Sequence, residues 1–403
     1  MDESAWHNDD YWVSSFNYAP EVRDKLDLPG KLTFHDVTLR DGEQTPGLVF
    51  RTKEKVRIAR MLDEVGVDRI EVAMPAVSEE DARAVKAVVE MGPDADVYVF
   101  SRARQDDIDL ALECGVDGII LEFPCGVPRM KHQFAKWSEN DIIELTTDSA
   151  KYAKAHGLKV VMFPLDSTRA RPAFLFRLME EVGTLPEIDS IGLVDTTGSL
   201  SPHAADFLIR RMKEITGKPL EIHTHNDFGM GVAVPMAAVA AGAEVVHASA
   251  CGLGERSGNT PLEEVAVTAR ALYGLEGNIR FDKLAELAEA IREISGFPLA
   301  PNKPVVGDRS FTRESGMGVN LVKDHPMVLF GMNPNFVGRQ PEYVLGKKSG
   351  MASVSMKLED LGLPQVSEDQ QAAILKAVKE LGISKKALVT DEEFKAIVAE
   401  VTG

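Results

Sequence analysis

The sequence predicts an α/β protein whose main part is a closed barrel of parallel strands. Short apolar segments alternate eight times with segments of helix length between residues 31 and 275. The longer segments carry apolar residues three or four positions apart, as in Val56, Ala59 and Leu62, which indicates amphipathic helices. Apolar strands between such helices form a parallel sheet covered by helices. Eight units at this length favour a (β/α)8 TIM barrel over the alternative, an open doubly wound sheet.

The predicted elements follow one another in a regular order. The strands are expected at residues 31–39, 69–74, 96–100, 118–123, 159–163, 190–195, 220–225 and 244–249. The helices that follow them are expected at residues 52–65, 78–91, 105–114, 139–156, 172–183, 202–216, 230–241 and 261–273. In this arrangement the carboxyl ends of all eight strands meet at one rim of the barrel.

The repeat ends near residue 275, and the chain beyond it has a different character. A helix at 282–295 precedes a Pro/Gly-rich stretch at 296–307, an irregular region at 308–355 and a small helical unit with helices near 367–381 and 391–401. We predict three parts: an N-terminal extension at 1–30, a barrel domain at 31–280, and a C-terminal linker or lid with a small, mainly helical region at 281–403. The aromatic extension should pack on the body or on a partner subunit. The C-terminal region could cover a barrel mouth or serve only for packing.

Composition narrows the class of protein. The chain has 403 residues, 44% of them hydrophobic, and a formal net charge of −18. We expect no nucleic-acid partner for so acidic a chain, because phosphate binding needs a basic face. Three cysteines predict a reducing compartment rather than a disulfide framework. With no signal peptide and no apolar run of bilayer length, we expect a cytoplasmic protein without a membrane partner.

Chemically capable residues collect at the predicted carboxyl ends of the strands. Active sites of such barrels lie at this rim, so the position alone selects candidates. They are Arg40, Asp41, Gln44, Glu71, Asp166, Arg169, Asp195, Thr196, His223, His225, Glu255, Arg256 and Asn259.

Four of these residues form a plausible set of ligands for one divalent metal. His223 and His225 are two positions apart, so on a strand both point to the same face, here the barrel interior. Two imidazoles with a carboxylate bind many divalent metals, and Asp41 is the best first carboxylate. Asn259 would add an amide oxygen, although a turn role is nearly as plausible.

Arg40 would place a permanent cation beside this metal. A metal next to a guanidinium suits a 2-oxo acid or an enolate, because both stabilise oxygen atoms that carry negative charge. The alternative is a structural ion pair inside the barrel. Thr196 could donate a hydrogen bond to the substrate carboxylate.

Three ordered motifs now resemble a known family. They are residues 37–44 (VTLRDGEQ), residues 223–227 (HTHND) and residues 252–259 (GLGERSGN). These segments resemble the signatures of the DRE-TIM metallolyases, and more narrowly of the Claisen-condensing branch with 2-isopropylmalate, homocitrate and citramalate synthases. The resemblance covers residues 31–275 and continues through residues 346–350 (GKKSG).

The resemblance implies a reaction between an acyl-CoA, most often acetyl-CoA, and a 2-oxo acid. A divalent cation (Mg²⁺, Mn²⁺, Zn²⁺ or Co²⁺) would be held by Asp41, His223, His225 and Asn259. The candidate catalytic residues are Arg40, Asp166 and Glu255, and the candidate substrate-binding residues are Arg40, Gln44, Thr196 and Arg169. Members of the family are typically homodimers in which the C-terminal region of one subunit reaches the site of the other.

Two departures from the family pattern concern proton transfer. Aligning Asp166 and Arg169 with the family motif places Leu165 where a catalytic glutamate usually stands. Both histidines of the C-terminal Phe-x-His-x-Ser-Gly-Ile-His pattern are missing, and Arg313 and Gly318 occupy their positions. We therefore keep two alternatives to condensation: a metal-dependent carbon–carbon lyase or aldolase acting on a 2-hydroxy or 2-oxo acid, and a non-catalytic sensor of metal and 2-oxo acid.

Overall fold

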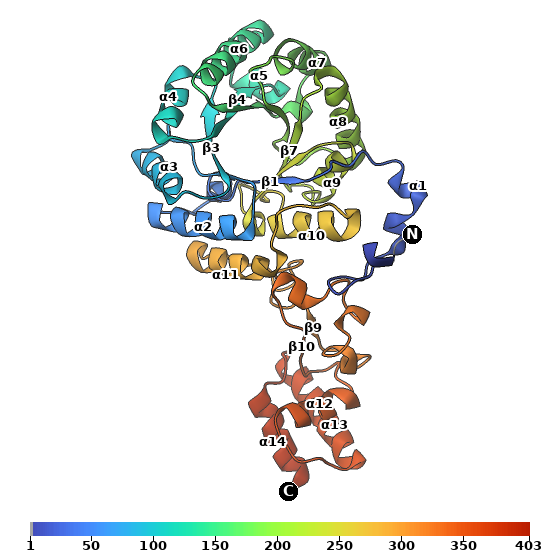
Figure 1. Ribbon diagram of the computed structural model, residues 1–403. Helices are drawn as coiled ribbons and strands as arrows, with labels where there is room; N and C mark the ends of the chain where they lie inside the picture. The colour runs from blue at the N-terminus through green and yellow to red at the C-terminus, as the bar shows by residue number, and fades with distance from the viewer. Residues whose placement is uncertain (1–2) are drawn as a thin grey trace. The chain divides into compact units, whose positions relative to one another are not determined.

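The computed structural model describes residues 3–403, which divide into two compact units (Figure 1). The first unit spans residues 14–299 and contains the barrel; the second combines residues 3–13 with residues 300–403. These limits differ from the predicted boundaries at residues 30 and 280, because residues 14–30 and helix α11 (Leu284–Ser295) fall within the barrel unit. In the described chain, no helix is long and apolar enough to cross a membrane.

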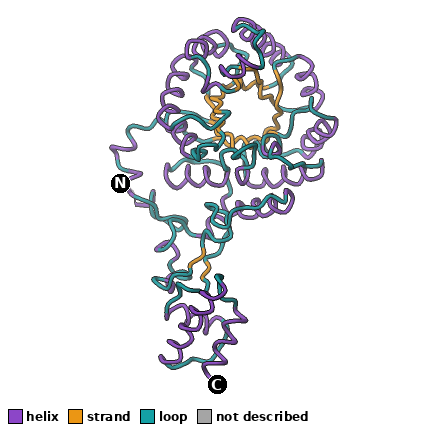
Figure 2. The backbone as a smooth tube through the Cα atoms, turned by 180° about the vertical axis from the view of Figure 1, so that it is seen from behind, coloured by secondary structure: helices purple, strands orange, loops and turns teal. Residues whose placement is uncertain are grey.

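The barrel consists of eight parallel strands that are paired in chain order (Figures 1 and 2). They are β1 (Thr33–Asp36), β2 (Arg69–Glu71), β3 (Asp96–Arg102), β4 (Gly118–Pro124), β5 (Lys159–Leu165), β6 (Ser190–Asp195), β7 (Leu220–Thr224) and β8 (Val245–Ala248). The ring closes between β1 and β8, where Thr33 lies opposite Val245 and Asp36 opposite Ala248. This closure confirms the predicted TIM barrel and excludes the open sheet.

Helices surround the strands, as Figure 2 shows from behind. They are α2 (Thr52–Val65), α3 (Glu79–Met91), α4 (Gln105–Cys114), α6 (Glu139–Ala155), α7 (Pro172–Leu178), α8 (Pro202–Thr216), α9 (Ala233–Ala240) and α10 (Leu262–Tyr273), with a short additional helix, α5 (Val127–His132), after β4. Helix α2 buries Ile58, Ala59 and Leu62, residues with the expected three- and four-residue spacing. The apolar faces of the helices therefore supply the outer half of the core.

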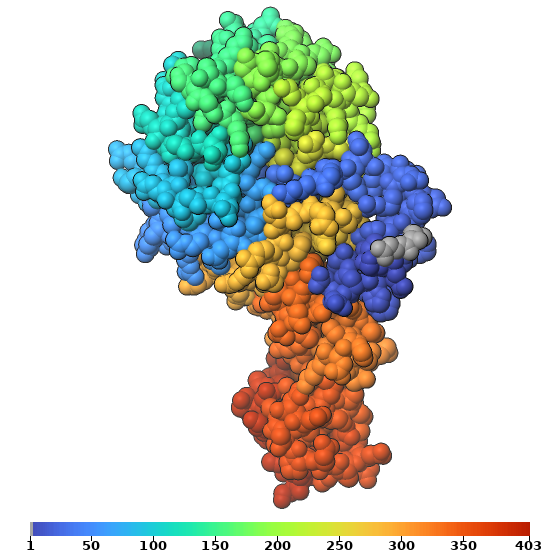
Figure 3. Space-filling view, viewed as in Figure 1, coloured from blue at the N-terminus to red at the C-terminus, as the bar shows by residue number. Residues whose placement is uncertain are grey.

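The segment before β1 packs on the barrel. The hydroxyl of Tyr18 donates to the carbonyl of Ala271 at 2.9 Å, and the guanidinium of Arg23 donates to the carbonyl of Tyr273 at 2.6 Å. Both carbonyls belong to the last turn of α10, and Figure 3 shows the blue N-terminal chain against this yellow part of the barrel. These contacts satisfy carbonyl groups that the end of a helix leaves unpaired.

Strand β1 ends earlier than the predicted strand at 31–39. The carboxylate of Asp36 accepts hydrogen bonds from the backbone N–H and the hydroxyl of Thr38, at 2.8 and 2.9 Å. Such a local bond turns the chain out of the extended conformation. The turn continues as the N–H of Asp41 donates to the carbonyl of Val37 at 2.9 Å. Arg40 and Asp41 therefore lie in a tight turn above the strand.

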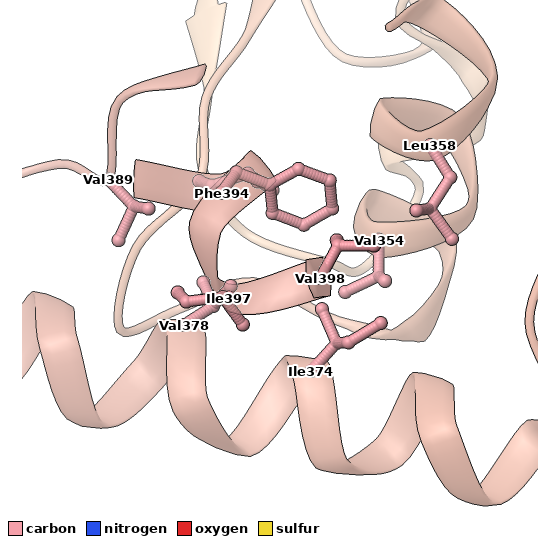
Figure 4. Close-up of a cluster of buried hydrophobic side chains, with 9 residues drawn as sticks. Val354, Leu358, Ile374, Val378, Val389, Phe394, Ile397 and Val398 are labelled. Atoms are coloured by element: carbon pink, nitrogen blue, oxygen red, sulfur yellow. The ribbon is translucent and has the colours of Figure 1, made fainter. Parts of the chain in front are cut away.

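The second unit has a core of its own, built by α12 (Met351–Asp360), α13 (Glu368–Lys385) and α14 (Asp391–Thr402). Figure 4 shows Val354, Leu358, Ile374, Val378 and Phe394 in this cluster. Helix α12 begins inside the stretch for which we expected irregular structure, and burial of Val354 and Leu358 against α13 and α14 explains its formation.

Two short segments of this unit that carry family-like motifs lie against each other. Strands β9 (Thr312–Arg313) and β10 (Glu342–Tyr343) form a parallel pair. Beyond them, the N–H of Gly316 donates to the carbonyl of Lys348 at 3.0 Å. The segments 311–318 and 346–350, far apart in the sequence, thus form one local structure.

Candidate metal centre

Asp41, His223 and His225 come together at the C-terminal end of the barrel. His223 lies on β7, His225 follows its last residue, and Asp41 lies in the turn after β1. The Oδ2 atom of Asp41 is 3.2 Å from Nε2 of His223 and 3.6 Å from Nε2 of His225. All three side chains are at most 4% exposed. The two-residue spacing of the histidines on the strand therefore directs both rings to one carboxylate, as the sequence predicted.

Asn259, the predicted fourth ligand, lies next to this group in the fold. A backbone bridge pairs Asn259 with His225. Its side-chain amide donates to the carbonyl of Leu253 at 2.9 Å, while among the described residues its buried Oδ1 has no hydrogen-bond partner. The preceding Gly258 has φ +84°, and a Cβ there would lie 2.0 Å from the carbonyl oxygen of Gly252. Only glycine fits that turn, which holds Asn259 in place.

The charge state of the cluster matches that of metal ligands. Burial opposes ionisation of Asp41, but Arg40, His223 and His225 outweigh it and hold the pKa of the carboxyl far below its ordinary value. Burial lowers the pKa of His223, and it lowers the pKa of His225 to about 4. Near neutral pH the cluster thus consists of a carboxylate and two neutral imidazoles, the forms that bind divalent cations.

Unpartnered buried atoms show that these residues fit a cation. Oδ1 of Asp41 and Oδ1 of Asn259 are both buried without a hydrogen-bond partner in the described part of the chain. A native structure rarely leaves such atoms unsatisfied, and a bound ion is one explanation. Two nitrogens and two oxygens suit Zn²⁺, Mn²⁺, Co²⁺ or Mg²⁺. The ligand atoms of Asp41, His223 and His225 lie within 4.8 Å of one another, so these three residues form a candidate metal site, with Asn259 as the predicted fourth ligand.

Arg40 is fixed next to this cluster and keeps one donor free. Its Nε donates to Glu71, its Nη1 lies 3.6 Å from Oδ2 of Asp41, and its guanidinium lies 4.3 Å from the centre of the Phe100 ring. Among residues 3–403, nothing accepts a hydrogen bond from its buried Nη2. Burial opposes ionisation of Glu71, but Arg40 outweighs it and lowers the pKa of Glu71 to about 2. The ion pair therefore orients a guanidinium with a spare N–H.

A cavity of about 430 Å³ opens beside Arg40. Arg40 and Gln44 both line it, so the structure joins two of the predicted substrate-binding residues. Met74, Val77 and Phe100 give the cavity apolar walls. It offers room for a small organic acid beside Arg40.

The other predicted site residues lie in neighbouring loops. The buried carboxylate of Asp166 accepts two hydrogen bonds from Arg169, both at 2.8 Å. Thr196 accepts the backbone N–H of Asp166 at 2.9 Å, and Glu255 pairs with Arg256 on the partly exposed rim. In the described chain, no hydrogen bond or ion pair joins these residues to Asp41, His223 or His225.

Leu165 takes the interior position next to Asp166. It packs with Phe100 against the buried cluster that includes Phe163 and Val194 inside the barrel. Asp166 follows the end of β5 with φ 62°, a left-handed conformation that turns the chain, and its carboxylate lies against Arg169 and Gly126. The position predicted for a glutamate is therefore an inward one, and it holds an apolar side chain. Gly318 and Arg313 both lie in the second unit.

Arg256 connects three of the loops around the cluster, a role that we did not predict. Its guanidinium donates to Asp227 at 2.9 Å, to Glu255 and to the backbone carbonyl of Thr196. These partners follow β7, β8 and β6 respectively. Arg256 also has φ 58°, a conformation that is uncommon for a residue with a side chain and that concentrates at functional sites. The sequence feature that could have indicated this role was the predicted position of Arg256 after the end of a strand.

A second histidine–carboxylate cluster lies among the strands of the barrel. His247 contacts Glu221 at 2.7 Å, His35 contacts Glu71 at 3.0 Å, and the two imidazole rings stack with centroids 4.3 Å apart. Arg69 donates to Glu221 at 2.7 Å. The signal for Glu221 was its two-residue spacing from His223, which predicts the same inward face.

Asp41, His223 and His225 form a cluster at the mouth of the barrel, which we call the mouth cluster. Together with the fold, it defines a class: a TIM-barrel enzyme with a candidate metal site at the carboxyl ends of its strands. The fold is shared with 3-hydroxy-3-methylglutaryl-CoA lyase from Bacillus subtilis. The TM-score is 0.60 at 21% sequence identity, over 68% of this chain and 96% of that structure. A likeness at this level establishes the barrel and leaves the family to the sequence.

The sequence comparisons settle the family. Residues 31–291 match the HMGL-like family, and residues 305–386 match the homocitrate synthase post-HMGL domain. A homocitrate synthase of Methanopyrus kandleri is 38% identical over 95% of this chain and 96% of its own length. The 2-isopropylmalate synthase of Methanocaldococcus jannaschii is 37% identical over 94% and 73%, and its (R)-citramalate synthase 38% over 91% and 74%. This chain belongs to the HMGL-like family, and the predicted resemblance to its condensing synthases is confirmed.

Proposed function

We propose that this chain is a metal-dependent acyltransferase that condenses an acyl-CoA, acetyl-CoA above all, with a 2-oxo acid. The products are CoA and a 2-hydroxy di- or tricarboxylate. The observation that carries the proposal is the position of buried Arg40. It keeps an N–H without a partner in the described chain, it lies beside the Asp41, His223 and His225 group, and it lines a cavity together with Gln44. The similarity to three kinds of condensing synthase supports the same reaction.

A divalent cation on Asp41, His223, His225 and Asn259 would supply Lewis-acid chemistry toward a 2-oxo acid. Arg40 would donate its Nη2 hydrogen bond to the ketone oxygen, which becomes an alkoxide when the acyl-CoA enolate attacks the ketone carbon. One carbon–carbon bond forms in this step. Water then cleaves the thioester, so that CoA leaves as a thiol and a carboxylate remains.

The remaining predicted residues would bind and orient the substrates. Gln44 would contact the 2-oxo acid from the wall of the cavity, and Thr196 would donate to its carboxylate. The Asp166–Arg169 pair would fix the neighbouring loop, with Asp166 and Glu255 as the candidates for proton transfer. A homodimer would bring the second unit of one subunit to the site of the other.

A thiol-release assay tests this function. The protein is incubated with acetyl-CoA, each of several divalent metals and a panel of 2-oxo acids, and free CoA is measured. We expect metal-dependent release of CoA with one or a few of the acids, and loss of that release in Arg40→Gln. Absence of CoA release with every acid and metal would overturn the proposal.

One observation favours a second candidate, a carbon–carbon lyase or aldolase. Leu165 places an apolar side chain at the inward position where condensing relatives are expected to carry a glutamate. Retro-aldol cleavage would use the same metal ligands and Arg40 without thioester hydrolysis. Release of a 2-oxo acid from a 2-hydroxy acid in the absence of CoA would support this reading.

A further inference from the structure

Several carboxylates at the mouth of the barrel are held by cationic partners. Asp166 accepts two hydrogen bonds from Arg169, and Glu255 pairs with Arg256. Glu71 is engaged by an arginine and by a histidine. Partners of this kind favour the ionised form of a carboxyl group and so weaken it as a base. These three residues are therefore poor acceptors for a proton that is bound to carbon.

Glu122 on β4 is a carboxylate of the mouth without such a partner. Ile120, two positions earlier, packs in the interior cluster with Phe163, so the alternation of the strand directs Glu122 to the inside as well, one layer nearer the mouth. Glu122 alone among the residues of β4 is partly exposed. Within residues 3–403, no hydrogen bond or ion pair engages its side chain. Its carboxylate therefore faces the open end of the barrel.

Glu122 lies next to the position at which the sequence lacks a glutamate. In the pairing of β4 with β5, Glu122 is opposite Phe163, and Leu165 is the next inward residue of β5. Neighbouring strands are about 4.8 Å apart, a distance that a glutamate side chain spans. A carboxylate that starts from β4 can thus reach the space that a glutamate at position 165 would occupy.

The charges around Glu122 suit a base. Burial raises the pKa of the Glu122 carboxyl to about 6, although Arg129, Arg102 and Arg40 favour its ionised form; Asp107 opposes that form. The inward side chains of β5 are apolar and add no charge. Such a group is largely ionised at neutral pH and holds a proton more firmly than an ordinary carboxylate. The influence of Arg40 also places the carboxylate on the side of the substrate cavity.

We propose that Glu122 is the general base that removes a proton from the α-carbon of the acyl-CoA. The inference rests on the proposed function. In this step the C–H bond breaks, the proton passes to the Glu122 carboxylate, and the electron pair stays on the acyl-CoA as an enolate. The enolate carbon attacks the ketone carbon of the 2-oxo acid. Glu122 then returns its proton to the alkoxide, so its carboxylate is restored before water cleaves the thioester.

Glu122→Gln tests this role, because it removes the base and keeps the size of the side chain. The metal-loaded protein is assayed by CoA release with acetyl-CoA and the 2-oxo acid that the wild type uses fastest. We expect kcat to fall by about 100-fold or more, the range for a lost general base. The KM for the 2-oxo acid, the metal content and the unfolding midpoint should not change. Glu113→Gln, an exposed change on α4, is the matched control and should keep the kcat of the wild type.

Two further measurements separate a base from a structural residue. The kcat/KM of the wild type should fall as the pH drops below about 6, because Glu122 becomes protonated; Glu122→Asp should keep such a limb and Glu122→Gln should lose it. Deuteration of the acetyl methyl should slow Glu122→Gln more than the wild type, because proton removal becomes the slowest step. A kcat in Glu122→Gln equal to that of the wild type, or a lower kcat with an unchanged pH limb and isotope effect, would overturn the inference alone. Absence of CoA release from the wild type with every acid and metal would instead reject the proposed function and this role with it.

Discussion

The two histidine–carboxylate clusters of the barrel have similar components, but their carboxylates are paired differently. The histidines of both clusters keep a buried Nδ1 without a partner in the described chain, so the contrast lies in the oxygen atoms. At the mouth, Asp41 and Asn259 each keep a buried oxygen without a partner in the described chain. In the cluster below, Arg69 and Ser190 both donate to Glu221, at 2.7 and 2.6 Å. The stacked rings of His35 and His247 are only 15° from parallel, so their nitrogen lone pairs do not converge on one point. Proximity of ligand atoms is therefore insufficient; a metal site also needs convergent, unpaired atoms.

The largest expected effect is a difference in metal content between variants of the two clusters. His223→Ala should remove stoichiometric metal binding and lower activity by more than about 100-fold, because loss of even an outer partner costs 10–100-fold. Metal analysis after dialysis and circular dichroism measure binding and folding. His35→Ala is the matched histidine change and should leave one metal per chain. Equal loss of metal in both variants would contradict the distinction between the clusters.

The next effect concerns stability. Glu221→Gln should lower the free energy of unfolding by about 3 kcal/mol, because it leaves the partly buried Arg69 beside an uncharged partner. Metal content should not change. Denaturant unfolding gives the comparison with Glu214→Gln, which breaks an exposed pair with Arg211 and should cost less than about 1 kcal/mol. A variant that loses metal at unchanged stability would assign the lower cluster to metal binding.

A smaller effect is expected from the loops that hold the mouth cluster. Arg256→Ala should weaken metal affinity by about 10–100-fold, the range seen when a partner that orients a ligand is removed. Arg256→Lys should restore little of this, because a single ammonium cannot reach three separate acceptors as a guanidinium does. Titration with the metal under a competing chelator provides the measurement. Unchanged affinity in both variants would make Arg256 a surface contact only.

The smallest effect is a pH dependence of the lower cluster. Burial lowers the pKa of His247 from its ordinary 6.5 to about 4. Between these values the unfolded chain binds more protons than the folded one, so stability falls as the pH falls from 6.5 toward 4. We expect His247→Leu to reduce the loss of unfolding free energy between pH 7 and pH 5 by about 1–2 kcal/mol. An identical slope in both proteins would show that His247 does not titrate on unfolding.

The sequence predicted the barrel well because its signal is local and repeated. Eight alternations of apolar strand and amphipathic helix required only chain order, and the two-residue spacing of His223 and His225 required only the alternation of a strand. The turn that places Arg40 depended on a side-chain bond from Asp36 to Thr38, which no periodicity reveals. Helix α12 was not predicted, because its stability comes from burial of Val354 and Leu358 against helices that lie later in the sequence.

Contacts between loops were harder to predict than contacts along a strand. No spacing in the sequence relates Arg256 to its three hydrogen-bond partners. The inward direction of Leu165 could be seen only from the position of β5 in the barrel. A cavity that Lys131, Trp137 and Arg171 line combines residues from separate segments, so no local pattern in the sequence predicted it. Spatial convergence of this kind depends on the closed barrel, which a linear pattern does not represent.

Strand β7 carries Glu221 and His223 on one face, with His225 directly after it, so the lower cluster and the mouth cluster share one strand. A slip of β7 by a single residue would turn these side chains outward, into the apolar layer under the helices. Arg69 would then lose its carboxylate partner inside the barrel. The misaligned chain would bury several polar groups without partners, at a cost of several kcal/mol. The same polar residues that form the site thus act as a safeguard against misfolding, because only one alignment of this strand satisfies them.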